Sequence, residues 1–209
     1  MRILLADDHG ILRYGLKGIL AKEFQEAEFG EVETAQAALE QVRKSGWDIV
    51  ILDVTMPGRS GLDVLKEIKQ CRPKLPVLIL SMHPEDQYGV RVLQAGADGY
   101  MTKVRAPIEL VQAVKTVLKG DKYISATVAV KLASYVGPGR NKLPHERLSG
   151  REFEVLRMIG SGQTIKEIAS ILSVSLQTVS THRSRMLKKM GLQSTASLIR
   201  YSLENKLVD

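Results

Sequence analysis

The feature that most constrains this chain is a set of short segments that are apolar at consecutive positions. In Ile49–Leu52, for example, every residue is apolar, so both faces of a strand formed there must be covered. The other segments of this kind are Ile3–Ala6, Ala27–Val32, Val77–Leu80 and Gly99–Met101. Because amphipathic stretches separate them, the pattern predicts a parallel sheet with helices on both faces.

The amphipathic stretches carry helix-end signals. Thr34 precedes an apolar stripe, as an N-cap residue does, while Pro107 and Gly120 suit the beginning and the end of a helix. The expected helices cover residues 11–21, 34–44, 60–70, 85–95 and 107–119. Alternating strands and helices over residues 1–120 predict a flavodoxin-like α/β domain with a five-stranded parallel sheet in the order 2-1-3-4-5.

Polar residues follow four of the five predicted strands. Asp7 and Asp8 follow the first, Asp53 the third, Ser81 the fourth and Lys103 the fifth. The carboxyl ends of parallel strands meet at one edge, so these groups are expected to converge. Clustered carboxylates favour Mg²⁺, and a central carboxylate such as Asp53 can accept a phosphoryl group. Lys103 would supply a positive charge to that group, and Ser81 a hydroxyl hydrogen bond.

Residues 1–120 resemble the receiver domain of bacterial two-component response regulators. The resemblance rests on four motifs: Leu5–His9, Leu52–Gly58, Leu80–Ser81 and Ala95–Lys103. It implies that a sensor histidine kinase phosphorylates Asp53. It also implies that Mg²⁺ is held by Asp7, Asp8, Asp53 and the main-chain carbonyl of Thr55.

The same resemblance implies that Ser81 and Tyr100 form a switch pair, in which the hydroxyl moves onto the phosphoryl group and the ring follows. A buried core tyrosine is the alternative interpretation of Tyr100. Two positions depart from the family pattern: Val104 stands where many receivers have proline, and Gly10 replaces a frequent proline.

The charge of the chain is unevenly distributed. Its net charge is +7, yet residues 1–120 hold 16 basic and 16 acidic residues, whereas residues 121–209 hold 14 and 7. The whole excess lies in the last part of the chain, which predicts a polyanion-binding domain there. A single cysteine excludes an internal disulfide and fits the cytoplasm, and no apolar run is long enough to span a membrane.

Residues 121–146 are expected to be a linker, with a short helix over Ser125–Val136 and a break at Gly137–Asn141. Residues 147–209 are expected to form an all-α domain with a helix-turn-helix at about 164–190. Two capping boxes, at Ser149–Glu152 and Thr164–Glu167, mark the beginnings of helices in this domain. A further helix is expected to begin after the N-cap Ser175 and to end at Gly191.

The helix after Ser175 has two distinct faces when projected at 100° per residue. Val179, Met186 and Met190 share the predicted core face. The opposite face carries small polar and basic residues: Ser180, Thr181, Ser184, Arg185 and Lys188. No acidic residue lies between Glu167 and Glu204, so this face suits a DNA groove.

Residues 148–207 resemble the LuxR-type helix-turn-helix of the NarL/FixJ branch, on the motifs Leu148–Glu152, Glu167–Ala169 and Thr178–His182. The resemblance implies that Ser180, Thr181 and Ser184 face base edges. It places five residues near phosphates: Lys166, Thr178, Arg185, Lys188 and Lys189. His182 is interpreted as a packed core residue. The last helix, Ser194–Leu203, implies a homodimer on an operator of double-stranded DNA.

Together these features predict a transcriptional response regulator that is not an enzyme, resides in the cytoplasm and joins the nucleoid when active. Three alternatives stand beside it. The first is a phosphohydrolase of the haloacid dehalogenase type, although Thr55 occupies the position of its second aspartate. The second is a ligand-sensing LuxR-type regulator, and the third is a DNA-binding protein whose receiver is vestigial.

Overall fold

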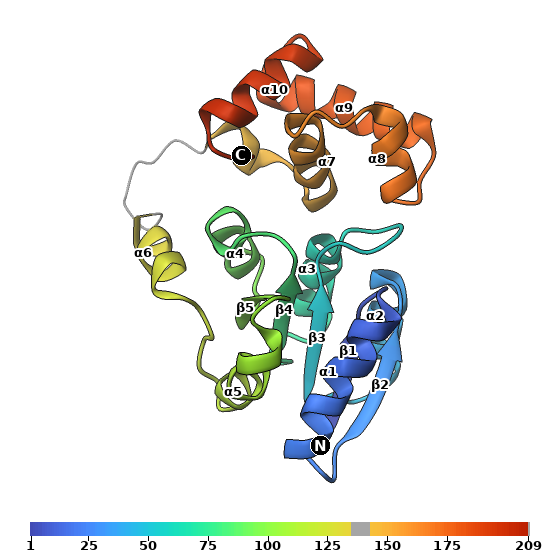
Figure 1. Cartoon of the computed structure of the whole chain (residues 1–209), viewed down its shortest axis with the longest axis vertical. Helices are drawn as coiled ribbons and strands as arrows, with labels where there is room; N and C mark the ends of the chain where they lie inside the picture. The colour runs from blue at the N-terminus through green and yellow to red at the C-terminus, as the bar shows by residue number, and fades with distance from the viewer. Residues whose placement is uncertain (135–142, 209) are drawn as a thin grey trace. The chain divides into compact units, whose positions relative to one another are not determined.

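The computed structural model describes residues 1–134 and 143–208, and the chain divides into two compact units, Met1–Pro138 and Gly139–Asp209. The first unit contains a five-stranded parallel sheet in the order β2-β1-β3-β4-β5 (Figure 1). The strands are β1 (Arg2–Ala6), β2 (Glu28–Val32), β3 (Ile49–Asp53), β4 (Val77–Ser81) and β5 (Gly99–Thr102). This confirms the predicted fold class and strand order of this domain.

Helices cover both faces of the sheet, because the central strands are apolar on both sides. One face packs under α1 (Gly10–Glu23) and α5 (Ala106–Leu118), with a core that runs from Ile3 through Leu78 to Val117. The other three helices of the α/β domain are α2 (Ala35–Lys44), α3 (Gly61–Cys71) and α4 (Glu85–Gln94). Thr34 caps α2 as predicted, since its side chain accepts a hydrogen bond from Ala37 N–H.

Residues 121–134, expected to begin the linker, belong to the first compact unit. Tyr123 extends the sheet edge through a parallel bridge to Gly99, and its carbonyl accepts a hydrogen bond from Tyr100 N–H. The short helix, α6 (Ala126–Ser134), packs against α4, where Gly89 leaves room for Val128. The last part of the predicted helix and the predicted break at Gly137–Asn141 lie outside the described residues.

The second unit is helical, as predicted. A 3₁₀ turn, η1 (Pro144–Arg147), precedes α7 (Gly150–Gly160), α8 (Ile165–Ile171), α9 (Leu176–Met190) and α10 (Thr195–Glu204). The core forms where α7 packs against α9 and α10 and where α8 packs against α9. His145 Nδ1 lies 2.8 Å from the Tyr201 hydroxyl and ties η1 to α10.

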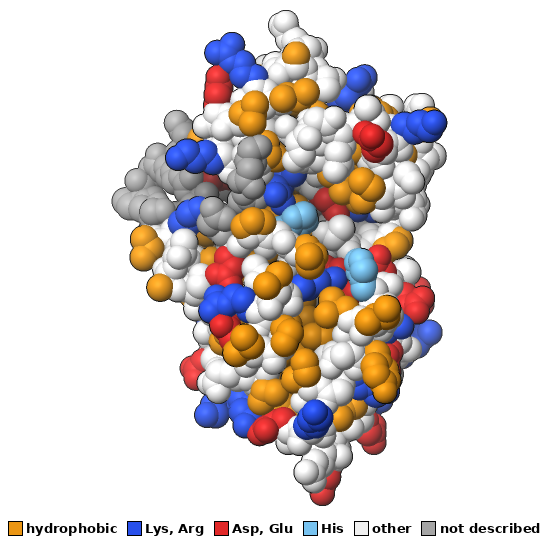
Figure 2. Space-filling model, in the orientation of Figure 1, with side chains coloured by type: hydrophobic (Ala, Val, Ile, Leu, Met, Phe, Trp, Pro, Cys, Tyr) orange, Lys and Arg blue, Asp and Glu red, His pale blue; other side chains and the backbone are white. Residues whose placement is uncertain are grey.

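The surface of the first unit carries hydrophobic side chains as well as charged ones (Figure 2). On α1 and α5 the most exposed of these are Ile11, Tyr14 and Ile108. Among the described residues, no helix is long and apolar enough to cross a membrane.

Candidate functional site

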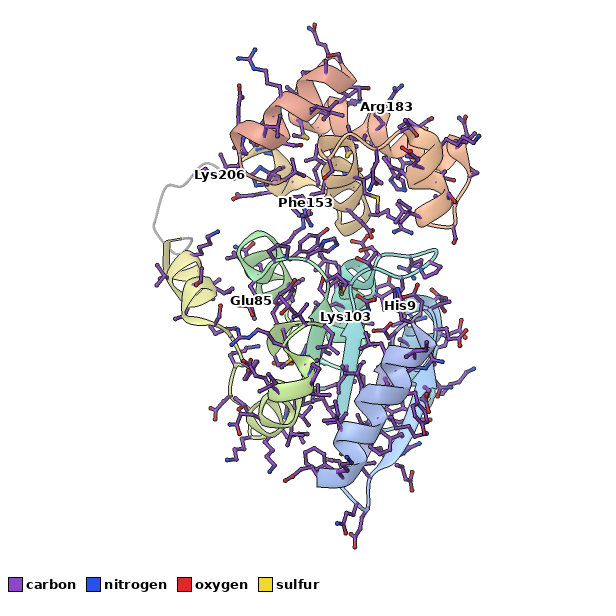
Figure 3. The ribbon with its side chains drawn as sticks, in the orientation of Figure 1. His9, Glu85, Lys103, Phe153, Arg183 and Lys206 are labelled. Carbon is purple, nitrogen blue, oxygen red and sulfur yellow. The ribbon has the colours of Figure 1, made fainter. Side chains whose placement is uncertain are left out.

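The strand-end residues meet at one edge of the sheet because neighbouring strands are in parallel register. Asp53 is the last residue of β3 and Ser81 the last of β4, while Asp7 and Lys103 directly follow β1 and β5. His9 and Lys103, labelled in Figure 3, lie at this carboxyl end of the sheet. The structure therefore brings together the residues that the sequence assigned to one site.

Lys103 binds two carboxylates at the centre of this site. Its Nζ lies 2.7 Å from Asp53 Oδ2 and 2.8 Å from Asp7 Oδ2. The side chains of these three residues are no more than 4% exposed. Buried charges are stable only when opposite charges neutralise one another. Here one ammonium group faces two carboxylates. The site therefore carries an excess of negative charge.

The pKa of Asp53 reflects the burial of its carboxyl group more than this excess of negative charge. Burial raises its pKa to about 6, Lys103 opposes that rise, and the neighbouring charge of Asp7 adds to it. Burial acts the opposite way on Lys103, but Asp53 and Asp7 outweigh it and hold the lysine pKa above its usual value. The pKa values of Asp53 and Lys103 are both raised, so the cleft favours the protonated form of each group.

The acidic cluster fits a divalent cation. One ligand atom from each of Asp7, Asp8, His9 and Asp53 can be chosen so that all lie within 4.8 Å of one another. Two carboxylate oxygens of this cluster, Asp7 Oδ2 and Asp8 Oδ1, are buried and accept no well-aligned hydrogen bond from described residues. Lys103 lies at ion-pair distance from the first oxygen and His9 from the second. Carboxylate oxygens are the ligands that Mg²⁺ prefers, so the donor set suits this ion.

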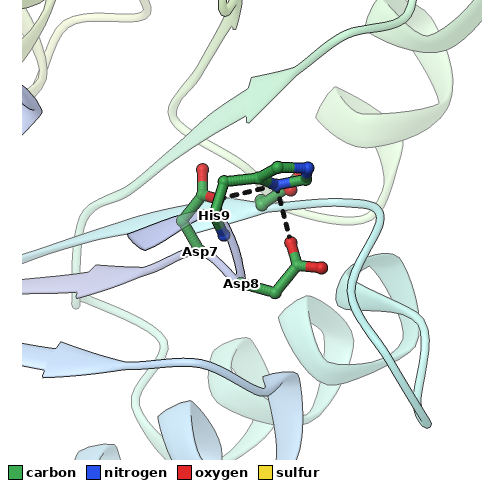
Figure 4. A group of neighbouring side chains, drawn as sticks. Asp7, Asp8 and His9 are labelled. Carbon is green, nitrogen blue, oxygen red and sulfur yellow. Dashed lines mark hydrogen bonds and ion pairs between the residues drawn. The ribbon is translucent and has the colours of Figure 1, made fainter. Parts of the chain in front are cut away.

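His9 is a residue of this cluster to which the sequence assigned no role. Its Nδ1 lies 2.9 Å from Asp8 Oδ1 and 3.2 Å from Asp7 Oδ1 (Figure 4). Its backbone N–H also donates to Asp7 Oδ1 at 2.8 Å. Its place directly after the two aspartates was the available signal, because a residue there can fold back onto the acids before α1 begins.

Thr55 lies beside the phosphoacceptor candidate. Its N–H donates to Asp53 Oδ1 at 3.0 Å, which fixes the carboxylate, and its hydroxyl lies 3.2 Å from His83 Nε2. The ring of His83 in turn stacks on Tyr88, with 4.4 Å between the ring centroids. No role for His83 was predicted from the sequence, yet this residue connects the loops that follow β3 and β4.

Ser81 and Tyr100 both bind the backbone of His83. The Ser81 hydroxyl accepts a hydrogen bond from His83 N–H at 3.1 Å, and the Tyr100 hydroxyl donates to the His83 carbonyl at 2.8 Å. Tyr100 is buried, with 1% of its surface exposed. Tyr100 is therefore a core residue that shares the contact residue His83 with Ser81, and the switch role of the pair stays a prediction.

The two departures from the family pattern leave these groups in place. Val104 is exposed, and no peptide bond among the described residues is cis. Gly10 is the first residue of α1, and the preceding His9 forms no side-chain cap.

The second unit contains the predicted helix-turn-helix. Both capping boxes are confirmed, with Ser149 and Thr164 accepting from Glu152 and Glu167 N–H. Ser175 caps α9, and Gly191 ends it at a φ of 68°, a left-handed conformation that favours glycine. The predicted core face is also confirmed, because Val179, Met186 and Met190 are buried.

The predicted DNA contacts differ in their surroundings. Lys166, Ser184, Arg185 and Lys188 are exposed, while Thr178, Ser180 and Thr181 are half-buried, as is His182. Lys189 is exposed too, but its Nζ lies 2.9 and 2.6 Å from the two carboxylate oxygens of Glu152. Burial raises the pKa of Glu152, but Lys189 and Ser149 outweigh it and lower that pKa overall. Lys189 therefore joins α9 to α7, a contact that the sequence did not predict.

Comparison with known proteins agrees with both units. Residues 3–115 match the response regulator receiver domain, and residues 146–202 match the bacterial regulatory proteins of the luxR family. The chain belongs to the NarL/FixJ family of DNA-binding two-component response regulators.

Relatives match over nearly the whole length. The response regulator UvrY of Escherichia coli K12 is 32% identical over 208 residues, which are 99% of this chain and 95% of UvrY. The oxygen regulatory protein NreC of Staphylococcus carnosus is 36% identical, with all of both chains covered.

Among solved structures, RcsB of Salmonella typhimurium is similar, at 29% identity and a TM-score of 0.57 over 96% of this chain and 97% of RcsB. RcsB of Salmonella enterica serovar Typhimurium, bound to a promoter with the phosphomimetic BeF3-, matches at 29% identity with a TM-score of 0.61, over 96% of this chain and 97% of RcsB.

Proposed function

We propose that a sensor histidine kinase transfers a phosphoryl group to Asp53 and that this transfer controls how the chain binds an operator of double-stranded DNA. The observation that carries the proposal is the position of Asp53, buried at the end of β3 against Lys103 and Asp7. A carboxylate fixed by Thr55 N–H, with a cation beside it, is arranged as a nucleophile toward phosphorus.

In this step an oxygen of Asp53 forms a bond to phosphorus while the bond from phosphorus to the histidine nitrogen of the kinase breaks. Lys103 then exchanges part of its contact with Asp53 for a phosphoryl oxygen, because an ammonium group binds phosphate as a point charge. Asp7, Asp8, Asp53 and the Thr55 carbonyl would hold Mg²⁺, which when bound would neutralise negative charge on the transferring group.

The switch follows from the contacts of Ser81. Its hydroxyl holds His83 N–H, so turning toward a phosphoryl group on Asp53 ends that hydrogen bond. The His83 carbonyl is the acceptor for Tyr100, and release of His83 therefore changes the position available to the tyrosine ring. The relative RcsB, solved on a promoter with a phosphomimetic, supports this link between receiver and DNA.

The last helix suits assembly of two chains on DNA. Leu203 is exposed on α10, which supports a homodimer on the operator through that helix. The protein accepts a phosphoryl group on itself and is not a phosphohydrolase: at the position of a phosphohydrolase's second aspartate stands Thr55, whose hydroxyl contacts His83. We place the protein in the cytoplasm, where it joins the nucleoid when active, because its DNA target is there.

The proposal is tested by phosphoryl uptake from acetyl phosphate with Mg²⁺. We expect Asp53→Asn to abolish labelling, because the amide cannot act as the nucleophile, and removal of Mg²⁺ to suppress it in the wild type. Asp121→Asn, at an exposed aspartate after α5, is the matched control and should label normally. Undiminished labelling of the Asp53 variant would refute the assignment, and hydrolysis of a phosphate ester over many turnovers would favour the phosphohydrolase.

A further inference from the structure

The first turn of α9 presents two side chains to which the sequence analysis gave no role. Leu176 and Gln177 are the first residues of the helix, directly after the Ser175 cap. Both are exposed, Leu176 to 53% of its surface. In helix-turn-helix proteins the N-terminal residues of the second helix contact base edges, so this turn occupies the position where sequence is recognised.

Gln177 lies in the middle of the outer face of α9. At 100° per residue, Gln177, Thr181, Ser184 and Lys188 fall within about 60° of one another. This stripe is about 170° from the direction of the buried core residues of the same helix. Since no acidic residue occurs between Glu167 and Glu204, nothing in this stretch of sequence repels a polyanion.

The hydroxyls on this stripe already donate within the helix. Thr181 Oγ1 donates to the Gln177 carbonyl at 2.8 Å, and Ser184 Oγ donates to the Ser180 carbonyl at 3.0 Å. While these bonds last, both hydroxyls act only as acceptors toward a base. The side-chain amide of Gln177 is exposed and makes no hydrogen bond to any described residue, so its donor and its acceptor are both available.

We propose that Gln177 recognises an adenine in the major groove by two hydrogen bonds and that Leu176 contacts the 5-methyl group of a thymine beside it. Gln177 Oε1 accepts from adenine N6–H, and its Nε2 donates to adenine N7, which is the pairing that amide side chains make with adenine. An exposed leucine next to that amide supplies the apolar surface that a thymine methyl prefers. The inference rests on the family's DNA binding and is independent of phosphorylation at Asp53.

The test uses the full chain and a duplex that the wild-type chain selects from a random library of double-stranded DNA. Each adenine is replaced in turn by 7-deazaadenine, which lacks N7, and each thymine by uracil, which lacks the methyl group. For the wild type, 7-deazaadenine at one position per half-site should weaken binding about 5- to 150-fold, and uracil at a neighbouring position should weaken it less.

Variants assign the two effects to their residues. Gln177→Ala should bind the unmodified duplex at least as weakly as the wild type binds the 7-deazaadenine duplex, because it loses both hydrogen bonds, and should be insensitive to that replacement. Leu176→Ala should lose only the sensitivity to uracil. Gln193→Ala, at an exposed glutamine beyond the end of α9, is the matched control and should behave as the wild type.

The same measurements can overturn the inference. If Gln177→Ala weakens binding to all duplexes equally while sensitivity to 7-deazaadenine persists, the amide contacts a phosphate. If neither variant changes affinity or base preference, the first turn lies outside the groove. Circular dichroism of each variant verifies that α9 is intact.

Discussion

The two units of this protein place their charges in opposite environments. In the receiver, Lys103 lies buried between Asp53 and Asp7, so the cation and both anions are fixed by one another. On α9, Arg185 and Lys188 are exposed and face away from the core. Both regions are suited to phosphate, one to a single phosphoryl group and the other to the backbone of a nucleic acid.

The two regions depend on different physical properties. A buried charge cluster depends on the balance of its charges and the position of each atom, because water does not screen it. An exposed basic face depends on the number of cations and on salt, because it binds by displacing counterions from DNA. Substitutions and changes of pH or salt should therefore affect the two regions differently.

The largest expected effect comes from removing the buried cation. Lys103→Met leaves Asp53 and Asp7 facing each other without Lys103, and should lower the free energy of unfolding by about 3 kcal/mol at neutral pH without Mg²⁺. Lys115→Met removes an exposed partner of Glu23 and should cost less than about 1 kcal/mol. Urea denaturation measures both, and equal costs would contradict the distinction between buried and exposed charge.

The next effect is a pH dependence that only the buried site should show. The pKa of Asp53 is raised to about 6, so ionisation of this carboxyl group destabilises the folded protein. This destabilisation is complete above pH 6 and absent below the usual pKa of 3.8. We therefore compare the free energies of unfolding of Asp53→Asn and the wild type in a metal chelator. The difference should shift in favour of the variant by about 1 kcal/mol as the pH rises from 5 to 8. A difference in unfolding free energy that stays constant with pH would contradict this.

The smallest expected effect separates two neighbouring lysines on α9. Lys188→Ala should weaken binding similarly across DNA sequences and reduce the slope of log affinity against log salt by about 1. Lys189→Ala should change the slope less, because Glu152 already neutralises that ammonium group. Titrations of a DNA duplex at several salt concentrations decide this, and identical slopes for the two variants would show that Glu152 releases Lys189 on DNA.

Much of this architecture could be predicted from local sequence. Apolar runs gave the strands, and polar residues at their ends predicted the cluster of Asp53 and Lys103, because parallel strands end at one edge. The caps at Ser149 and Thr164 were equally local. The contacts of His83 with Thr55 and of Lys189 with Glu152 join residues 28 and 37 positions apart, and no periodicity encodes such pairs.

If phosphorylation of Asp53 controls DNA binding, the affinity for DNA must change with the phosphorylation state of that residue. The affinity of the full chain for its selected duplex is measured with and without acetyl phosphate and Mg²⁺, for the wild type and for Asp53→Asn. We predict that the phosphodonor raises the wild-type affinity about 5- to 150-fold and leaves the variant unchanged. Equal wild-type affinity with and without the donor, in protein shown to be phosphorylated, would contradict the claim and indicate a vestigial receiver.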